Sequence, residues 1–400
     1  MIRAGIRVVA ESTRSWLEID ETRLLGNYRV VREAAGANAD VLAVIKANAY
    51  GHGLEECAVA LVRADGLASE RPFWLGVADA AEGVRVRRAL QMAGLSHNAT
   101  EILTLYGVVH DDVRAIAEHG LTPVVWTQQQ VELLRGSGAR VHVEMETGMS
   151  RQGVRPGASL DALLRSIELA GLKLDGVMTH FHSAEIAGSE RTREQKARFE
   201  AAVAQVRAAG LKPRWIHAGS SSSVDVGEDP AWLAKLAESV GACAMVRSGI
   251  ALYGYCLPAE GVASCIRARL QPVMTWKTRV LDVREMAAGE TIGYDATFTA
   301  KRAMCVALLP VGYADGLRRE LSGTNDRPGG WVMARASDGA MRQANIVGRV
   351  SMDLTTVDVT DVDWVRVGDE VVLLGDGITA DDHARIAGTI AYEILCGIRA

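Results

Sequence analysis

VLAVIKANAYGHG, at residues 41–53, is a short apolar run that ends in a lysine and continues into small, polar and glycine residues. Its first five residues form the continuous apolar segment expected of a strand that is buried on both faces. Lys46 lies at the C-terminal end of this strand. A desolvated amine there is nucleophilic and suits a Schiff base with a carbonyl cofactor. On these residues alone, a lysine that only marks the strand end is an equally consistent interpretation.

Seven similar apolar runs follow, and amphipathic helical segments such as 54–66, 128–136 and 193–210 lie between them. Strand and helix alternating eight times is the pattern of a (β/α)8 barrel. An open doubly wound sheet is the alternative, but eight units within roughly 220 residues fit the barrel better. The eight predicted strands begin at residues 41, 73, 102, 122, 140, 174, 214 and 244.

The pattern changes at both ends of this region. Residues 15–19 predict a short strand, and residues 21–36 predict a helix that Asp20 can cap. From about residue 260 onward, β-like runs are separated by Gly, Asp and Asn turns, and one late helix is predicted over 381–395. We therefore predict a TIM-like barrel over 20–258 and a mostly antiparallel β domain over 259–400, which residues 1–19 are expected to join.

Composition narrows the class of protein. A chain of 400 residues accommodates two domains. Its net charge of −5 and lack of a basic run argue against a nucleic-acid partner. We see no signal peptide and no apolar segment near the roughly 18 residues of a membrane span, so we expect a cytoplasmic protein without a membrane partner. The cysteines have no metal or CxxC spacing and are expected to be reduced; they are Cys57, Cys243, Cys256, Cys265, Cys305 and Cys396.

Polar residues follow the predicted strands at the ends where barrel active sites form. After the seventh and eighth strands come HAGSSSS (217–223) and RSGIALYG (247–254). Together these loops offer hydroxyl donors and backbone N–H groups beside a glycine, which suits a phosphate. A serine run in isolation is more often a solvated loop, but its place opposite RSGI in a barrel favours the phosphate site.

K-A-N-A-Y-G-H-G (46–53) resembles the pyridoxal-phosphate attachment site of alanine racemases, and the chain resembles that family over nearly its whole length. The resemblance implies that Lys46 holds pyridoxal phosphate covalently and serves as one acid/base. It places His180 against the cofactor ring and Arg247 opposite the pyridine nitrogen. The implied phosphate contacts are Tyr50, Ser221 (with Ser220 as the alternative), Gly249, Ile250 and, at the site mouth, Tyr392.

The resemblance also identifies residues near the substrate. Arg151, in ETGMSRQG, matches an arginine that binds the cofactor's phenolic oxygen and the substrate carboxylate. GYDATFTA matches the segment with the second catalytic base, Tyr294, and GRVSMD matches the segment whose Met352 and Asp353 approach the carboxylate. The family places Tyr294 and Met352 in the other subunit's site, which implies a head-to-tail homodimer. Singly, such residues are more often packing; the ordered set favours function.

The implied mechanism uses two bases. Racemisation removes a proton from one face of the α-carbon and returns one to the other, with Lys46 serving the D face and Tyr294 the L face. A permanently charged Arg247 keeps the pyridine nitrogen unprotonated, which weakens the ring as an electron sink and disfavours transamination. The implied activity is alanine racemisation, which supplies D-alanine for peptidoglycan.

One position departs from the family pattern. Many members have a carbamylated lysine seven residues before the position of Arg151, where this chain has Glu144. Our hypothesis is that Glu144 supplies the same negative charge and holds Arg151 in place. The alternative is that Glu144 only lines the barrel interior. Smaller departures at Glu146, Ser150 and Glu185 bear on the breadth of specificity.

Three other functions fit the same broad pattern. A racemase for serine or larger amino acids is the nearest alternative. A decarboxylase of the same architecture keeps an acidic partner at the pyridine nitrogen, which Arg247 argues against. A non-enzymatic pyridoxal-phosphate carrier resembles the barrel alone, so the β domain argues against it.

Overall fold

The computed structural model describes residues 5–11, 14–63, 72–96 and 100–399, which form two compact units. The barrel unit consists of residues 24–49 and 54–271. The β unit consists of the residues up to 23, the short segment 50–53 and the residues from 272 onward. The boundaries between the units therefore lie near residues 24 and 272. The expected domain limits at residues 20 and 258 stay a prediction.

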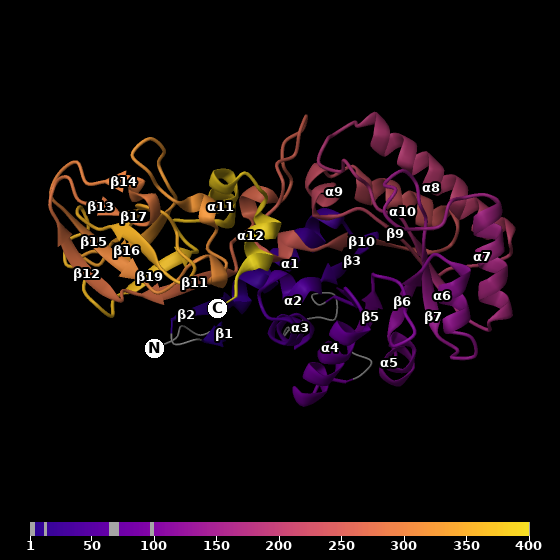
Figure 1. Ribbon diagram of the computed structural model, residues 1–400. Coiled ribbons are helices and arrows are strands. Elements are labelled where there is room, and N and C mark those ends of the chain that lie inside the picture. Colours follow the sequence, from indigo (N-terminus) through magenta and orange to yellow (C-terminus); the bar gives the residue numbers. More distant parts are fainter. Residues whose placement is uncertain (1–4, 12–13, 64–71, 97–99, 400) are drawn as a thin grey trace. The chain divides into compact units, whose positions relative to one another are not determined.

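The barrel unit is a closed barrel of parallel strands in which the last strand pairs with the first (Figure 1). All eight strands begin within two residues of their expected positions, so the predicted barrel is confirmed. The strands are mostly apolar because one face lines the barrel interior and the other packs against helices. They are β3 (Ala39–Val44), β4 (Trp74–Val77), β5 (Glu101–Thr104), β6 (Thr122–Val125), β7 (Arg140–Glu144), β8 (Lys173–Met178), β9 (Trp215–Ala218) and β10 (Cys243–Ser248).

Helices connect the barrel strands, and short polar residues fix where several of them begin. Thr127 forms a capping box with Gln130, and the carboxylate of Asp79 accepts a hydrogen bond from the backbone N–H of Glu82. The helices are α1 (Glu21–Ala35), α3 (Leu54–Arg63), α4 (Ala80–Met92), α5 (Asp112–His119), α6 (Gln128–Leu133), α7 (Ala158–Leu169), α8 (Glu190–Ala208), α9 (Ser221–Val226) and α10 (Asp229–Ser239).

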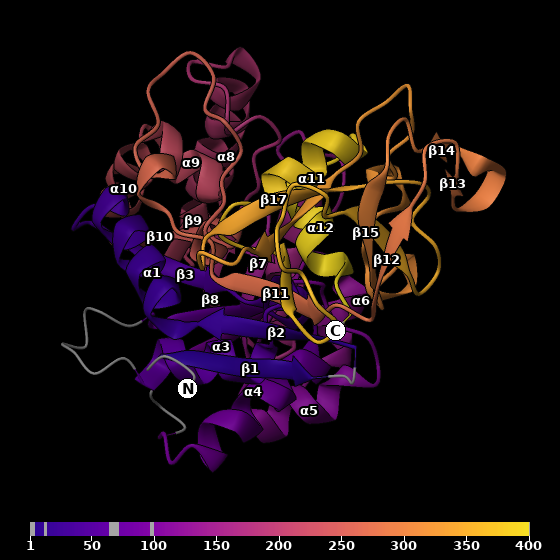
Figure 2. The same ribbon diagram turned by 90° about the vertical axis from the view of Figure 1, so that its left-hand side faces the viewer.

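The β unit is built on a nine-stranded antiparallel sheet. Its first two strands come from the N-terminal residues and pair beside a strand from the distant C-terminal part, as Figure 2 shows. In spatial order the strands are β1 (Ile6–Glu11), β2 (Ser15–Asp20), β11 (Met274–Arg279), β19 (Glu370–Leu374), β16 (Trp331–Arg335), β17 (Met341–Ile346), β18 (Thr355–Asp358), β15 (Met304–Leu309) and β12 (Asp282–Met286). A separate hairpin pairs β13 (Thr291–Ile292) with β14 (Phe298–Thr299).

The expected single helix over 381–395 is wrong. The structure has two helices there, α11 (Ala380–Ala387) and α12 (Ala391–Gly397). Gly388 adopts a left-handed conformation (φ 70°) and donates its N–H to Ala384, which ends α11 in the way glycine commonly does. Sequence periodicity continued across this glycine, so the break was not apparent.

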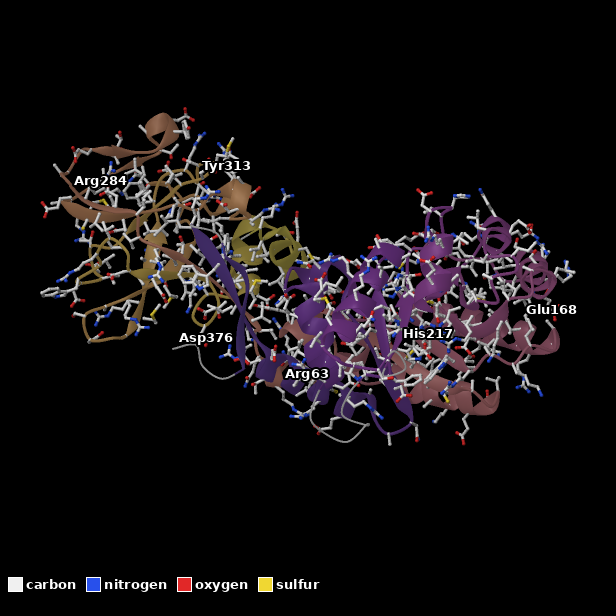
Figure 3. All side chains as sticks on the ribbon, turned by 90° about the horizontal axis from the view of Figure 1, so that it is seen from below. Arg63, Glu168, His217, Arg284, Tyr313 and Asp376 are labelled. Atoms are coloured by element: carbon white, nitrogen blue, oxygen red, sulfur yellow. The ribbon has the colours of Figure 1, made fainter. Side chains whose placement is uncertain are left out.

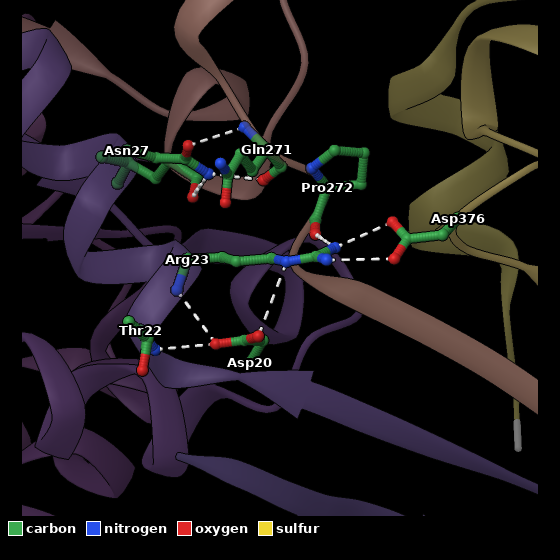
Figure 4. A network of polar contacts seen from close by, with 8 residues as sticks. Asp20, Thr22, Arg23, Asn27, Gln271, Pro272 and Asp376 are labelled. Atoms are coloured by element: carbon green, nitrogen blue, oxygen red, sulfur yellow. Dashed lines mark hydrogen bonds and ion pairs between the residues drawn. The ribbon is translucent and has the colours of Figure 1, made fainter. Parts of the chain in front are cut away.

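Within each unit, polar side chains join segments that are distant in the sequence, close to the residues where the unit begins and ends (Figure 4). In the β unit, Arg23 donates to both carboxylate oxygens of Asp376, each over 3.0 Å, and to the carbonyl of Pro272 over 2.9 Å. In the barrel unit, Asn27 bonds both the N–H and the carbonyl of Gln271, over 2.9 and 2.8 Å. Asp20 accepts from the backbone N–H groups of Thr22 and Arg23, which confirms it as the N-cap of α1.

Across the described ranges, every helix is either too short or too polar to cross a membrane.

Candidate active site at the carboxyl ends of the barrel strands

Lys46 lies two residues after Val44, which ends β3, at the carboxyl end of the barrel, and its side chain is half-buried. Its ammonium nitrogen lies 5.5 Å from the centroid of the Tyr106 ring, which gives a cation–π contact. Tyr106 follows β5 and was missed in the sequence. It falls in the predicted strand that begins at residue 102, and an aromatic residue near the carboxyl end of that strand was the available signal.

The turn after Lys46 is left-handed, although none of its residues is glycine. Ala47, Asn48 and Ala49 have φ values of 54–55°, and Tyr50 continues with φ 54°. Such a conformation costs about 1–2 kcal/mol per residue. Two hydrogen bonds within the barrel unit hold Asn48. Its side-chain oxygen accepts from the N–H of Leu54 over 3.1 Å, and its backbone N–H donates to the carboxylate of Glu82 over 3.0 Å. Strain of this kind concentrates at functional sites, which supports a function for Lys46.

Arg247, from β10, is a buried cation held by three acceptors. It donates to the carbonyl of Thr179 over 2.6 Å and to Nδ1 of His180 over 3.2 Å. It also donates to Nδ1 of His217 over 3.3 Å. Burial lowers the pKa of Arg247 to about 10, which still leaves the guanidinium charged at neutral pH. The structure thus fixes a positive charge at the base of the candidate site.

His180 follows β8 and is neutral in this environment. Burial, together with the charges of Arg247, Arg151 and Lys46, lowers its pKa to about 3. Its carbonyl accepts from Gln195 over 3.0 Å, which fixes the backbone. The sequence-predicted residues Lys46, Arg151, His180 and Arg247 are therefore brought together, as a neutral ring among three cations.

Hydroxyl and backbone donors converge beyond β9 and β10. The Ser221 oxygen accepts from the backbone N–H groups of Gly249 and Ala251, both over 3.2 Å. It also lies 3.0 Å from the hydroxyl of Ser248. Ser221, which begins α9, is thus the serine placed against the RSGI loop. These donors form the kind of cluster that binds a phosphate.

The loop that carries Arg151 is organised by Glu146. The Glu146 carboxylate accepts from the backbone N–H groups of Gly148 and Ser150, and Ser150 is held at φ 55°. Gly153 (φ 109°) closes the loop, and a Cβ there would lie 2.7 Å from the Glu146 nitrogen. The Arg151 side chain is exposed on this ordered loop.

Glu144 ends β7 and is buried. Gln152 donates to its carboxylate over 2.5 Å. Within the part of the chain that the structure describes, no hydrogen bond or ion pair joins Glu144 directly to Arg151. Burial raises the pKa of Glu144. The hydrogen bond from Gln152 and the charges of Arg247 and Arg151 reduce this rise.

Within the β unit, Tyr294 lies in a strained loop between β13 and β14. Gly293, Asp295 and Ala296 have positive φ values of 74°, 60° and 49°, and an ion pair of 2.7 Å joins Asp295 to Arg349. The Tyr294 side chain is 69% exposed. A large aromatic side chain that a strained loop presents to solvent is available to another molecule.

Met352 and Asp353 are exposed in the same unit, on a loop fixed by Arg14. Arg14 pairs with Asp353 over 3.0 Å and with Asp315 over 3.2 Å. The N–H of Tyr313 donates to the carbonyl of Ser351 over 3.0 Å. Tyr313 is exposed (Figure 3) and was missed in the sequence, where the turn-like GYADG gave no reason to single it out.

Tyr50 and Tyr392 also meet within the β unit. Their ring centroids lie 6.1 Å apart, and Tyr50 is buried. The structure therefore brings together two tyrosines that the resemblance placed near one phosphate.

The donor set of the barrel fits an anionic ring compound with a phosphate group. It combines an amine, a buried guanidinium, a neutral flat ring and converging N–H and hydroxyl groups. Among the described residues, no group of three His, Cys, Asp or Glu side chains is arranged to hold a metal ion.

Comparison with known proteins matches the two parts of the chain to two domains of one family. Residues 19–257 match the model for the alanine racemase N-terminal domain, and residues 273–400 match the model for the C-terminal domain. The chain belongs to the alanine racemase family. The alanine racemase of Symbiobacterium thermophilum is 38% identical, over 96% of this chain and 94% of its own. A catabolic alanine racemase of Pseudomonas putida is 36% identical, over 95% and 96%.

A solved structure of the alanine racemase from Streptomyces coelicolor A3(2) superposes with a TM-score of 0.82 and 32% sequence identity. The match covers 97% of this chain and 96% of the other. A barrel followed by an antiparallel β sheet is therefore the architecture of this racemase, as predicted.

Proposed function

We propose that this racemase interconverts L- and D-alanine with pyridoxal phosphate bound covalently to Lys46. The observation that carries the proposal is the cluster at the carboxyl end of the barrel, where Arg247 donates to the neutral ring of His180 and the charge of Lys46 acts on the same ring. When bound, pyridoxal phosphate delocalises the charge that develops as the α-proton leaves. The chain's own residues bind, orient and move protons.

Each group has a binding role that its surroundings support. The Ser221 hydroxyl and the N–H groups of the 249–251 loop would hold the phosphate, with Ile250 as a backbone ligand in this loop. Tyr50 and Tyr392 would contact the same phosphate. His180 would lie flat against the ring, because a neutral imidazole stacks without adding charge.

Arg247 would face the pyridine nitrogen. A guanidinium carries donors only, so it offers that nitrogen hydrogen bonds while withholding a transferable proton. The three acceptors around Arg247 fix the orientation of its guanidinium. The weaker electron sink that results would favour return of the proton to the α-carbon over loss to transamination.

Two bases on opposite faces of the α-carbon would move the proton. Lys46 would serve one face, and Tyr294 of the partner subunit would serve the other. Arg151, Met352 and Asp353 would receive the substrate carboxylate, and Glu144 would support Arg151. The exposure of Tyr294 supports a head-to-tail homodimer in which each site uses residues of both subunits.

Cys243, Cys265 and Cys305 are free thiols, which supports a reducing, cytoplasmic location. There the enzyme would supply D-alanine for peptidoglycan.

The first test is to incubate the pyridoxal-loaded protein separately with L-alanine, L-serine and L-lysine. Chiral chromatography then follows the D isomers. D-alanine alone would support a dedicated alanine racemase. Comparable turnover of serine or lysine would support the alternative of a broader racemase, favoured by the departures at Glu144 and Ser150. Amines or pyruvate without D isomers would contradict the roles of Arg247 and Tyr294.

The second test asks whether the sites are shared. Lys46→Ala and Tyr294→Phe should each be nearly inactive. Mixing and reassembling the two variants should create dimers with one intact site, because each subunit keeps the residue that the other lacks. Recovery of activity is expected. Failure to recover, with dimer exchange confirmed by mass, would contradict the shared site.

A further inference from the structure

Beneath Arg247, three polar side chains form a buried chain through the barrel interior. Nε2 of His217, from β9, lies 2.8 Å from Nδ1 of His142, from β7. Nε2 of His142 lies 3.9 Å from a carboxylate oxygen of Asp175, from β8. All three are at most 2% exposed, and Figure 3 labels His217 inside this unit. Residue patterns alone did not indicate that these three side chains meet.

The donors fix where every proton lies. Arg247 can only donate, so in this arrangement Nδ1 of His217 accepts and its proton is on Nε2, where it needs an acceptor of its own. That N–H then donates to Nδ1 of His142, which leaves the His142 proton on Nε2, facing Asp175. At 3.9 Å this last contact is too long for a hydrogen bond, so it is a charge–dipole contact between the neutral imidazole N–H and the carboxylate. Both imidazoles are therefore neutral and each has one permitted tautomer.

The backbone is shaped to admit this arrangement. A Cβ at Gly176 would lie 2.6 Å from the His142 ring, so the glycine leaves the space that the imidazole fills. The pairing of β7 with β8 shifts register at Asp175, between the partners of Val141 and His142. Such a bulge re-aims a side chain. Trp74 packs edge-on against His142 with ring centroids 5.1 Å apart.

Asp175 is itself anchored. Arg140 lies 3.8 Å from the Asp175 carboxylate and donates to Glu101 over 2.5 Å. Although burial opposes it, the nearby His142 and the charge of Arg140 lower the pKa of Asp175. Asp175, the last of the three side chains, is therefore a stable carboxylate that faces Nε2 of His142.

We propose that His142 and Asp175 are positioning residues that fix the tautomer of His217 and thereby hold Arg247 in place. With the other tautomer, His217 would set an N–H against the Arg247 N–H, and the guanidinium would lose one of its acceptors. The proposal rests on the proposed role of Arg247 opposite the pyridine nitrogen. It extends the functional site to the second layer of the barrel interior.

The test begins with 15N NMR of the loaded enzyme labelled at histidine, because the nitrogen shift distinguishes protonated from unprotonated ring nitrogens. His142→Asn and His217→Asn assign the signals. In the unmodified enzyme, both histidines should carry one proton, on Nε2. In His142→Leu, the His217 signal should report a mixture of tautomers. A proton on Nδ1 of His217, or an unchanged tautomer in His142→Leu, would overturn the proposal.

Kinetics provide the matched comparison. His142→Leu should lower kcat for alanine about ten- to a hundred-fold with little change in KM, if loss of one buried hydrogen bond is felt wholly at the transition state. His142→Asn keeps an acceptor near the Nδ1 position and should recover much of this loss. Asp175→Asn should fall between. Equal losses in His142→Leu and His142→Asn would contradict a positioning role.

Two further variants exclude a general effect on folding. Gly176→Ala removes no polar group but displaces the His142 ring. It should therefore give the same mixture of His217 tautomers as His142→Leu. His383→Gln changes another buried histidine, in the β unit, and should leave kcat unchanged. An unmodified enzyme that neither binds pyridoxal phosphate nor racemises alanine would contradict the proposed function. The NMR assignment, repeated without cofactor, would still decide the inference about tautomers.

Discussion

The side-chain amide of Gln152 links the buried carboxylate of Glu144, 2.5 Å away, to the carbonyl of Leu105, 3.2 Å away. Gln152 directly follows Arg151, so Glu144 acts on the arginine's neighbour in the chain as well as through its charge. The position where the family resemblance implies a carbamylated lysine therefore holds a carboxylate that anchors the loop carrying Arg151.

Glu144→Gln tests this anchor, because it preserves size but removes the charge near Arg151. We expect KM for alanine to rise about three- to tenfold with kcat nearly unchanged, since a change of about 1 kcal/mol in substrate binding is roughly fivefold. Steady-state kinetics in both directions would measure it. Gln152→Ala should raise KM in the same sense. Unchanged kinetics in Glu144→Gln would favour a residue that only lines the barrel.

Arg247→Gln tests the proposed charge opposite the pyridine nitrogen while keeping a donor for the Thr179 carbonyl. We expect racemisation to slow by about a hundredfold or more, because a buried guanidinium bonded to three acceptors is lost. Pyruvate should form alongside D-alanine, and a coupled dehydrogenase assay would detect it. Racemisation at the original rate without pyruvate would show that the arginine's charge does not control the fate of the proton.

His383→Gln tests how buried histidines set acid stability. Burial lowers the pKa of His383 from 6.5 to about 4, so between these values the unfolded chain binds the extra proton. Stability from this group is present above pH 6.5 and is lost as the pH falls toward 4, by about 1 kcal/mol per pH unit. The variant should flatten this loss. Melting curves of the cofactor-free protein between pH 4 and 7 would measure it, and parallel curves would contradict the assignment.

Asp20→Ala tests the cap at the start of α1. The carboxylate satisfies the N–H groups of Thr22 and Arg23 and lies 3.5 Å from the Arg23 guanidinium. We expect a loss of about 1 kcal/mol in the free energy of unfolding, typical of an N-cap. Asp20→Ser should recover most of it, because serine caps equally well. An alanine variant as stable as the original would show that solvent replaces the cap.

Sequence patterns predicted the barrel well because each strand contains a short apolar segment, as burial on both faces requires. The late helix was wrong because apolar periodicity crossed Gly388, whose left-handed backbone ends α11. The resemblance supplied Lys46, Arg151, His180 and Arg247, and the structure brings these four together. The contacts that Tyr106 and His142 make could not be predicted, because side chains from different strands meet only when the barrel closes.

The space that Gly176 leaves for the His142 ring has a consequence for how this protein can change over generations. A side chain at position 176 is excluded while an imidazole occupies position 142, since a Cβ would lie 2.6 Å from the ring. Loss of the imidazole alone would leave a void and an orphaned N–H on His217. Both single steps are therefore harmful, and the two positions should vary together among relatives or remain fixed together.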